Sequence, residues 1–150
     1  MNTASLLNDL VILDLEAESA ASALRSIGNH ALDKGLVAES WLDAVVKRES
    51  EFATGLPTDI PVAIPHTESM HVRADGFGFI RLTKPVQFIE MGTDDSPLEV
   101  SMIFPLLITN PSDQVELLQA VISLIQKPGV LENLSEAKAA AEVASLLAIG

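Results

Sequence analysis

The sequence predicts one α/β domain over residues 1–150, in which a mixed β-sheet is flanked by helices on both faces. Short, branched apolar runs that are typical of strands alternate along the chain with segments of helical periodicity. One apolar run, Leu98–Ile108, is hydrophobic on both faces from Val100 onward, as expected of a central strand with helices on each side. The chain contains no internal repeat, low-complexity tract or linker that would divide it into two domains.

The first part of the chain predicts a strand and two helices. The branched apolar run Leu10–Leu15 is the expected first strand. The helix that follows ends at the Lys-Gly pair at 34–35 and contains His30, which we expect at its surface. Its apolar residues recur at helical spacing: Leu24, Ile27, Ala31 and Leu32. Ser40 is expected to cap a second helix that ends near Phe52, with the apolar stripe Leu42, Val45 and Val46.

Strands dominate the middle of the chain, after a loop at 53–61 that glycine and proline residues punctuate. The expected strands are Val62–Pro65, Phe77–Leu82, a segment near Val86–Phe88, and Leu98–Ile108. Pro105 lies inside the last of these runs, where it cannot donate a hydrogen bond to the ladder. We expect a bulge or an edge-facing amide at this proline, rather than two separate strands.

Two helices are expected to complete the chain, which gives the order β-α-α-β-β-β-β-α-α. The first has Ser112 or Asp113 as its N-cap and ends at the Pro-Gly pair at 128–129. Its predicted apolar face is Val115, Leu118, Ile122 and Ile125. The last helix is rich in alanine and is expected from its cap at Ser135 to the end of the sequence at Gly150.

Composition and charge exclude several classes of protein. No uninterrupted apolar run of about 18 residues is present that could span a membrane. The 9 basic and 21 acidic residues give a net charge of -12, which argues against nucleic acid and anionic membranes as partners. The acidity fits steering towards a basic protein partner and also fits solubility alone. Residues 1–18 contain no Lys or Arg, unlike a secretory signal, so we expect a cytoplasmic protein.

The segment VAIPHTESMHV, Val62–Val72, holds two of the three histidines of the chain. Pro65 restricts the backbone before His66 and is expected to hold the imidazole at the rim of the sheet. An imidazole there can be a nucleophile near neutral pH, or a hydrogen-bonded residue at the end of a strand. A metal site of His66, Glu68 and His71 is not expected, because this spacing puts the two histidines on different faces of a helix or strand.

Three segments carry a family resemblance: KRESEFATG at 47–55, VAIPHTESMHV at 62–72 and NPSDQVELLQAV at 110–121. They resemble the enzyme IIA domains of the bacterial sugar phosphotransferase system, in the fructose–mannitol superfamily. In that family an R-E-x-x-x-x-T-G segment precedes an A-[IV]-P-H segment, and a later helix opens with a polar residue before a pair of leucines. The order of elements agrees over essentially the whole chain, and AIPHTESMH is most similar to the galactitol-type enzyme IIA. The resemblance therefore implies an enzyme IIA fold of the fructose/mannitol type.

A phosphorelay is the function that this resemblance implies. His66 would accept a phosphoryl group from the phosphohistidine of the histidine phosphocarrier protein and pass it to a cysteine of enzyme IIB. Because this chain has no cysteine, the enzyme IIB step would lie on a separate chain, with the membrane enzyme IIC reached indirectly. The resemblance implies no metal and no organic cofactor.

The resemblance also assigns roles to four further residues. Arg48 would steady the phosphoryl oxygens with its planar fork, whereas the alternative is a solvent-facing charge at a helix end. Gln114 stands where many family members have a second histidine, and its amide could orient a phosphoryl oxygen without supplying charge. Thr54 and Thr67 are candidate hydroxyl donors to the phosphoryl group.

Two other functions stay open at this point. A regulatory relative would use the same fold and histidine to report its phosphorylation state to another protein. A catalytically inactive binding module would keep His66 only as a structural residue.

Overall fold

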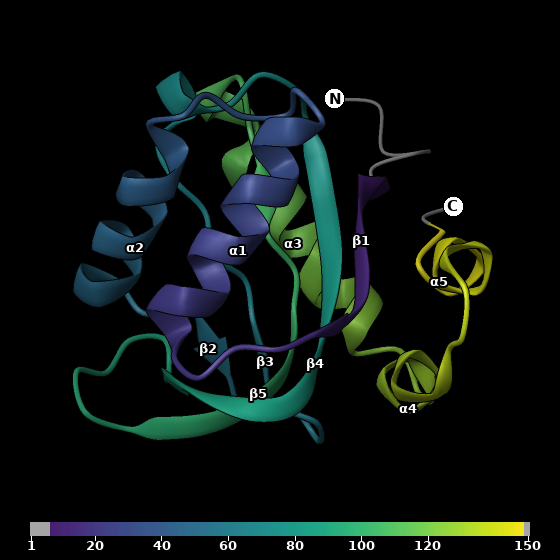
Figure 1. The fold of residues 1–150 in the computed structure, drawn as a ribbon. Helices are drawn as coiled ribbons and strands as arrows, with labels where there is room; N and C mark the ends of the chain where they lie inside the picture. The colour runs from purple at the N-terminus through teal and green to yellow at the C-terminus, as the bar shows by residue number, and fades with distance from the viewer. Residues whose placement is uncertain (1–6, 149–150) are drawn as a thin grey trace.

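A mixed β-sheet lies at the centre of the fold, and helices cover both of its faces, as predicted (Figure 1). The computed structural model describes residues 7–148, and six strands in this range form the sheet in the order β1-β4-β5-β3-β2, with β6 paired to β4. The strands are β1 (Leu7–Leu15), β2 (Gly55–Leu56), β3 (Val62–Ala63), β4 (Gly76–Ile89), β5 (Pro97–Ile103) and β6 (Leu106–Leu107). The helices are α1 (Ala20–Asp33), α2 (Trp41–Glu51), α3 (Gln114–Ile125), α4 (Val130–Glu136) and α5 (Ala140–Leu146), with short 3-10 helices η1 (Ser69–His71) and η2 (Pro111–Asp113).

Parallel and antiparallel pairs alternate across the sheet. β1 runs parallel to β4, β4 antiparallel to β5, β5 parallel to β3, and β3 antiparallel to β2. β3 is therefore an interior strand with neighbours on both sides. The segment that follows β3, which contains His66, leaves from the interior of the sheet rather than from an edge strand.

Each face of the sheet buries its own apolar layer, because successive side chains of a strand point to opposite faces. Val62 and Ile64 pack in the layer under α3, α4 and α5, whereas Ala63 between them packs in the layer under α1 and α2. Phe79 and Phe104 make a tilted ring contact in the first layer, with centroids 5.4 Å apart. The two layers hold the end of β3 from both sides.

Local signals determine the ends of the first two helices only in part. α1 begins at a capping box in which Ser19 and Ser22 bond to each other's backbone, and it ends before Gly35, whose φ is 72°. Ser40 stands at the N-cap of α2 but makes no side-chain capping bond, so the prediction that it caps this helix was wrong. Its hydroxyl lies 2.7 Å from Nδ1 of His71 instead.

The strands β4 and β2 differ from the predicted elements. β4 is one strand of 14 residues, where two strands were predicted. Its pairing with β5 shifts register between Arg81 and Val86, so the exposed residues at 83–85 form an irregularity inside a continuing strand. β2 lies in the segment that was predicted to be a loop, and its 2 residues are too few to produce an alternating pattern.

Pro105 divides the last apolar run into two strands, β5 and β6, so the prediction of one strand with a bulge was wrong. The carbonyl of Pro105 accepts a hydrogen bond from the N–H of Gly78 in β4, but the proline has no N–H to donate to β4 in return. On its other side, the N–H groups of the two residues that flank the proline donate to the carbonyls of Ala63 and Pro65. The chain thus stays bonded to the end of β3 while its ladder with β4 is interrupted.

The predicted apolar face of α3 is correct in part, since Ile125 is buried and Leu118 and Ile122 pack against the core at its border. Its buried residues are Leu117, Val121, Leu124 and Ile125, whereas Val115 is 64% exposed. Because α3 is apolar on more than one side, its periodicity allowed several faces, and packing against the sheet selected one. The side-chain cap before it also differs, because Asn110 caps η2 and Asp113 makes no capping bond.

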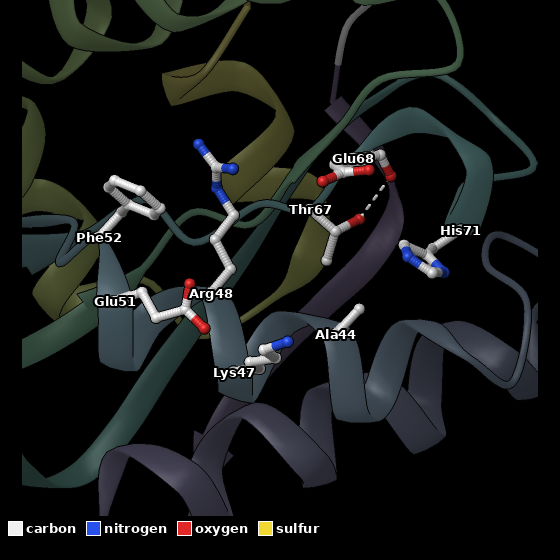
Figure 2. A pocket seen from close by; sticks show the side chains of 8 residues that line it. All are labelled: Ala44, Lys47, Arg48, Glu51, Phe52, Thr67, Glu68 and His71. Atoms are coloured by element: carbon white, nitrogen blue, oxygen red, sulfur yellow. Dashed lines mark hydrogen bonds between the residues drawn. The ribbon is translucent and has the colours of Figure 1, made fainter.

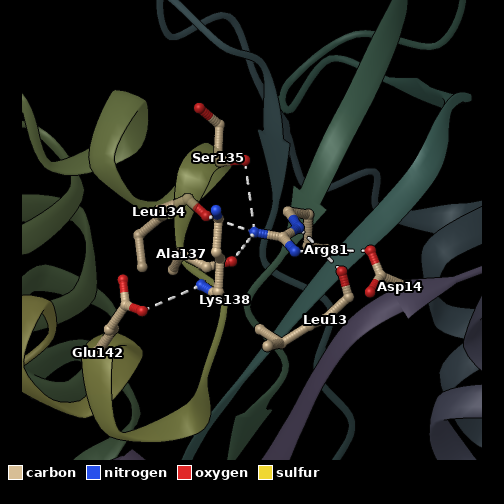
Figure 3. A network of polar contacts seen from close by, with 8 residues as sticks. All are labelled: Leu13, Asp14, Arg81, Leu134, Ser135, Ala137, Lys138 and Glu142. Atoms are coloured by element: carbon tan, nitrogen blue, oxygen red, sulfur yellow. Dashed lines mark hydrogen bonds and ion pairs between the residues drawn. The ribbon is translucent and has the colours of Figure 1, made fainter.

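The predicted last helix is two helices, α4 and α5, and Ser135 lies inside α4 rather than at a cap. The backbone is extended at Ala137 and again at Ala139, which ends α4 and separates it from α5. The side chain of Arg81, from β4, reaches this break (Figure 3). Its Nη1 donates to the carbonyl oxygens of Leu134 and Ala137 at 3.0 and 2.6 Å.

Arg81 also bonds to β1, the strand beside its own. Its Nε donates to the carbonyl of Leu13 at 2.8 Å, and its Nη2 lies 3.5 Å from the carboxylate of Asp14. The Asp14 side chain is 77% exposed, so this ion pair contributes little, and the carbonyl bonds are the stronger part of the network. One guanidinium therefore ties the α4–α5 break to β1 and β4.

No helix within residues 7–148 is long and apolar enough to cross a membrane. Two sequence expectations fall partly outside the described range. Residues 1–6 belong to the segment in which no secretory signal was expected, and residues 149–150 belong to the predicted last helix.

Arg81→Ala is expected to lower the free energy of unfolding by roughly 2–4 kcal/mol, because it removes the hydrogen bonds to partly buried carbonyls of β1 and of the α4–α5 break. Arg81→Lys should recover only part of this loss, since an ammonium group cannot reproduce the planar fork. Urea unfolding followed by circular dichroism measures the effect. Lys84→Ala, an exposed substitution in the same strand, is the control and should change stability by less than about 0.5 kcal/mol. An Arg81→Ala protein as stable as the wild type would contradict this role.

Candidate functional site

His66 is buried just after β3, with 6% of its surface exposed. Its Nδ1 lies 2.9 Å from the carbonyl oxygen of Ile64. A carbonyl oxygen can only accept a hydrogen bond, so Nδ1 carries the proton of the neutral ring. Nε2 is then left with a free lone pair, which makes it the nucleophilic nitrogen of this imidazole.

The surroundings of His66 favour its neutral form. Burial lowers the pKa of the imidazole below its ordinary value of 6.5, because the charged ring would lose solvation. The hydrogen bond to the carbonyl of Ile64 raises this pKa, and the positive charge of Arg48 lowers it further. Burial is the largest of these effects, so the lone pair on Nε2 is available near neutral pH.

Gln114 contacts His66 from the start of α3. It is the first residue of α3, and its Nε2 lies 3.4 Å from Nε2 of His66. The amide can donate a long hydrogen bond to the lone pair of the imidazole, or to an oxygen of a group bound there. The structure therefore brings together two predicted site residues that are 48 positions apart in the sequence.

Arg48 lies in the last turn of α2 and lines a pocket of about 240 Å³. Figure 2 shows its guanidinium extending from the helix beside Phe52, whose ring centroid is 5.3 Å from Cζ. Its Nε is buried without a hydrogen-bond partner among the described residues, and its guanidinium forms no ion pair within residues 7–148. Only Nε is buried and the residue as a whole is half-buried at a helix end, so this placement agrees both with an anion contact and with the solvent-facing alternative considered from the sequence.

Thr67 lines the same pocket as Arg48, whereas Thr54 does not. The hydroxyl of Thr67 donates to the carbonyl of Glu68 at 2.9 Å and keeps its oxygen as an acceptor (Figure 2). Thr54 is 3% exposed, and its hydroxyl donates to a carboxylate oxygen of Glu49 at 2.7 Å. The hydroxyl proton of Thr54 is thus engaged by Glu49, as that of Thr67 is engaged by the carbonyl of Glu68.

His71 also lines the Arg48 pocket, and its Nδ1 bonds to Ser40 at 2.7 Å. Its backbone carbonyl accepts from the N–H of Ala38 at 2.9 Å. These two bonds join η1 to the segment before α2. Within residues 7–148, no group of three or more His, Cys, Asp or Glu side chains is arranged to hold a metal ion.

Glu49 is a polar residue near the site that sequence reasoning did not select. Its two carboxylate oxygens accept from the N–H and the hydroxyl of Thr54, both at 2.7 Å. Burial raises the pKa of Glu49 above its ordinary value of 4.5, and the bonds from Thr54 and the charge of Arg48 partly offset this effect. The signal was present in the R-E-x-x-x-x-T-G segment, which contains Glu49 and Thr54 at this spacing.

Comparison with known proteins identifies the class to which this fold and site belong. Residues 5–149 match the family described as phosphoenolpyruvate-dependent sugar phosphotransferase system, EIIA 2, and the chain belongs to this family. It is 35% identical over 115 residues to the galactitol-specific EIIA component of the phosphotransferase system of Escherichia coli K12, a match that covers 76% of each chain. The resemblance inferred from the three sequence segments is therefore confirmed.

Solved structures confirm the fold. The enzyme IIA of Escherichia coli in the mannitol-specific complex of IIA with phosphorylated enzyme IIB has a TM-score of 0.75 to this chain, with 21% identity over 95% of this chain and 99% of that one. The nitrogen regulatory protein IIA-Ntr of Neisseria meningitidis has a TM-score of 0.73, with 26% identity over 95% and 96% of the two chains. The chain is thus an EIIA-type phosphotransferase component of a sugar phosphotransferase system.

His66 is expected to titrate below 6.5 in the folded chain, and Arg48→Gln should raise its pKa because the variant removes a nearby positive charge. NMR titration of the imidazole measures both values. Since the unfolded chain binds this proton more readily, the free energy of unfolding should fall as the pH drops through 6.5 towards the lower pKa of the folded state. His66→Gln should remove this component of the pH dependence.

The control for this titration is Lys138→Gln, which removes an exposed positive charge beyond α4. It should leave the pKa of His66 unchanged. An Arg48→Gln protein whose His66 titrates at or below the wild-type value would contradict the placement of this charge.

Proposed function

We propose that this chain is a phosphocarrier that accepts a phosphoryl group on Nε2 of His66 from the phosphohistidine of the histidine phosphocarrier protein. It then passes the group to a cysteine of an enzyme IIB on a separate chain, during uptake of a sugar of the galactitol type. The bond from Nδ1 of His66 to the carbonyl of Ile64 is the observation that carries the proposal, because it leaves Nε2 as the free nitrogen. Membership of the EIIA family and the galactitol-specific relative support the substrate class.

The two transfers conserve the electron pairs of the nitrogen atoms. In the first, the lone pair of Nε2 forms a bond to phosphorus while the N–P bond of the donor phosphohistidine breaks, and the donor nitrogen keeps that pair. In the second, a cysteine thiolate of enzyme IIB attacks phosphorus, and Nε2 of His66 regains its lone pair. Nδ1 keeps its proton in both steps, so the phosphorylated ring is positively charged. The carbonyl of Ile64 stabilises that charge through a charge-assisted hydrogen bond.

Arg48 and Gln114 contribute different interactions to these steps. The unpaired guanidinium of Arg48 neutralises the phosphoryl oxygens, which is the main requirement when a phosphoryl group moves between two side-chain nucleophiles. The amide of Gln114 donates to one phosphoryl oxygen and orients it, without adding charge. Thr67 borders the space between them.

The partners follow from the same chemistry. These 150 residues contain no cysteine, so the thiolate comes from enzyme IIB, and the membrane enzyme IIC is reached only through enzyme IIB. The mannitol-specific enzyme IIA of Escherichia coli has been solved with phosphorylated enzyme IIB, which supports this order of transfer. We place these exchanges in the cytoplasm.

A reconstituted transfer assay tests the phosphorelay. Wild-type chain mixed with radiolabelled phosphocarrier protein should take up label, and His66→Ala should take up none. His30→Ala, which removes an exposed histidine of α1, is the matched control and should label like the wild type. Absence of label on the wild type, or normal labelling of His66→Ala, would overturn the proposal. Labelling without onward transfer to a galactitol-type enzyme IIB would favour a regulatory protein.

Arg48→Gln is expected to slow labelling about a hundredfold, because it removes the positive charge that stabilises the moving phosphoryl group. Arg48→Lys should recover only part of the rate, since a point charge cannot engage two oxygens in the same way. Single-turnover labelling measures these rates, and Lys138→Gln serves as the control for a lost positive charge. A labelling rate of Arg48→Gln within about twofold of the wild type would show that Arg48 does not act on the phosphoryl group.

A further inference from the structure

A chain of hydrogen bonds runs from Glu49 in α2 to the imidazole of His66. The carboxylate of Glu49 accepts from the hydroxyl of Thr54 at 2.7 Å. The hydroxyl oxygen of Thr54 accepts from the N–H of Ile64 at 3.2 Å. The carbonyl of Ile64 then accepts from Nδ1–H of His66 at 2.9 Å.

We propose that Glu49, acting through Thr54, is a positioning residue that holds His66 in the Nδ1–H tautomer with Nε2 free to receive the phosphoryl group. This inference rests on the proposed role of His66 as the phosphoryl acceptor. Glu49 does not touch the reacting atoms. It acts by fixing the hydroxyl of Thr54, which then holds the peptide unit of Ile64 in the position where its carbonyl accepts the Nδ1 proton of His66.

The carboxylate of Glu49 determines the orientation of the first hydrogen bond in this series. An ionised carboxylate can only accept hydrogen bonds, so the hydroxyl proton of Thr54 must point to Glu49. The lone pairs of the same hydroxyl then face the N–H of Ile64. The backbone N–H of Thr54 also donates to Glu49, at 2.7 Å, so both donors of this threonine end on one carboxylate.

The N–H of Ile64 has its partners in Thr54, whose backbone carbonyl extends the β2–β3 pairing and whose hydroxyl adds a second acceptor. The carbonyls of Ala63 and Pro65 accept from the chain that follows β5, whereas the N–H and carbonyl of Ile64 face the opposite side. There the N–H meets the backbone carbonyl and the hydroxyl of Thr54, at 3.3 and 3.2 Å. Pro65 has no N–H that could hold the next peptide unit from that side. The orientation of the Ile64 carbonyl therefore depends on Thr54.

The buried negative charge of Glu49 does not stabilise the fold. A role of Glu49 in positioning His66 can therefore be measured apart from any role in stability. Glu49 forms no ion pair within residues 7–148, and burial raises its pKa. The folded chain thus binds this proton more readily than the unfolded chain, and the contribution of Glu49 to stability falls as the pH rises through 4.5. A neutral side chain of the same shape should fold at least as well at neutral pH, while it cannot force the hydroxyl of Thr54 into one direction.

The tautomer of His66 can be measured in the unphosphorylated full-length chain by 15N NMR of the imidazole. In the wild type, Nδ1 should be protonated and Nε2 should not. Glu49→Gln and Thr54→Val are each expected to raise the population of the Nε2–H tautomer about tenfold, which corresponds to the loss of one hydrogen bond. Thr54→Ser keeps the hydroxyl and should retain the wild-type tautomer. Glu136→Gln, the same substitution at an exposed residue of α4, is the control.

Single-turnover labelling by the phosphorylated phosphocarrier protein is the second measurement. Glu49→Gln and Thr54→Val should slow it by about tenfold to a hundredfold, because the nucleophile is displaced or protonated in part of the population. Thr54→Ser and Glu136→Gln should label at nearly the wild-type rate. Thermal unfolding of each variant, followed by circular dichroism, identifies any loss of rate that comes from unfolding.

The outcomes are distinguishable. If Glu49→Gln and Thr54→Val fold and keep both the wild-type tautomer and the wild-type rate, the positioning role is overturned. If Thr54→Val does not fold, Glu49→Gln alone decides, since it retains the hydroxyl and removes only the charge. If the wild type takes no label, the proposed function fails, whereas the NMR measurement still decides whether Glu49 controls the tautomer.

Discussion

The carbonyl group of Ile64 is the contact on which the geometry of the site depends. It lies at the end of an interior strand, between two apolar layers, and it accepts the Nδ1 proton of His66. Because a carbonyl cannot donate, this one bond determines the tautomer of the ring and leaves Nε2 free. Burial keeps the same ring neutral by lowering its pKa. The buried position of His66 directly after β3 therefore determines its place in the fold, its tautomer and its charge state.

Two helices on opposite faces of the sheet contribute the other residues of the proposed site. α2 packs on one apolar layer and contributes Arg48, whereas α3 packs on the other layer and contributes Gln114. Arg48 brings a positive charge without an ion pair among the described residues, and Gln114 brings a neutral amide 3.4 Å from Nε2 of His66. An edge strand without helices on both faces could not receive side chains from two such helices. Because β3 is an interior strand of a sheet covered on both faces, residues from α2 and from α3 can both belong to the proposed site.

Arg48 and Glu49 are consecutive residues with opposite charges and different surroundings. Successive residues of a helix point about 100° apart, so one side chain reaches the pocket beside the site while the other reaches Thr54. Their separation matters for the proposed function, because a direct ion pair would neutralise the guanidinium that is proposed to contact the phosphoryl group. The two hydrogen bonds from Thr54 occupy the carboxylate and leave Arg48 unpaired. In this way a buried carboxylate is accommodated beside a cation without consuming its charge.

The sequence by itself determined the layered α/β architecture, because alternating strand and helix patterns depend on the burial of neighbouring residues. It also pointed to His66 and Arg48, which lie in short contiguous motifs. The tertiary structure alone decided features that depend on partners far away in the chain. Arg81 occupies the break between α4 and α5 from more than 50 residues away, and the sheet selects the buried face of α3. The tautomer of His66 likewise depends on hydrogen-bond directions, which the fold alone determines because donors and acceptors from three segments must meet in space.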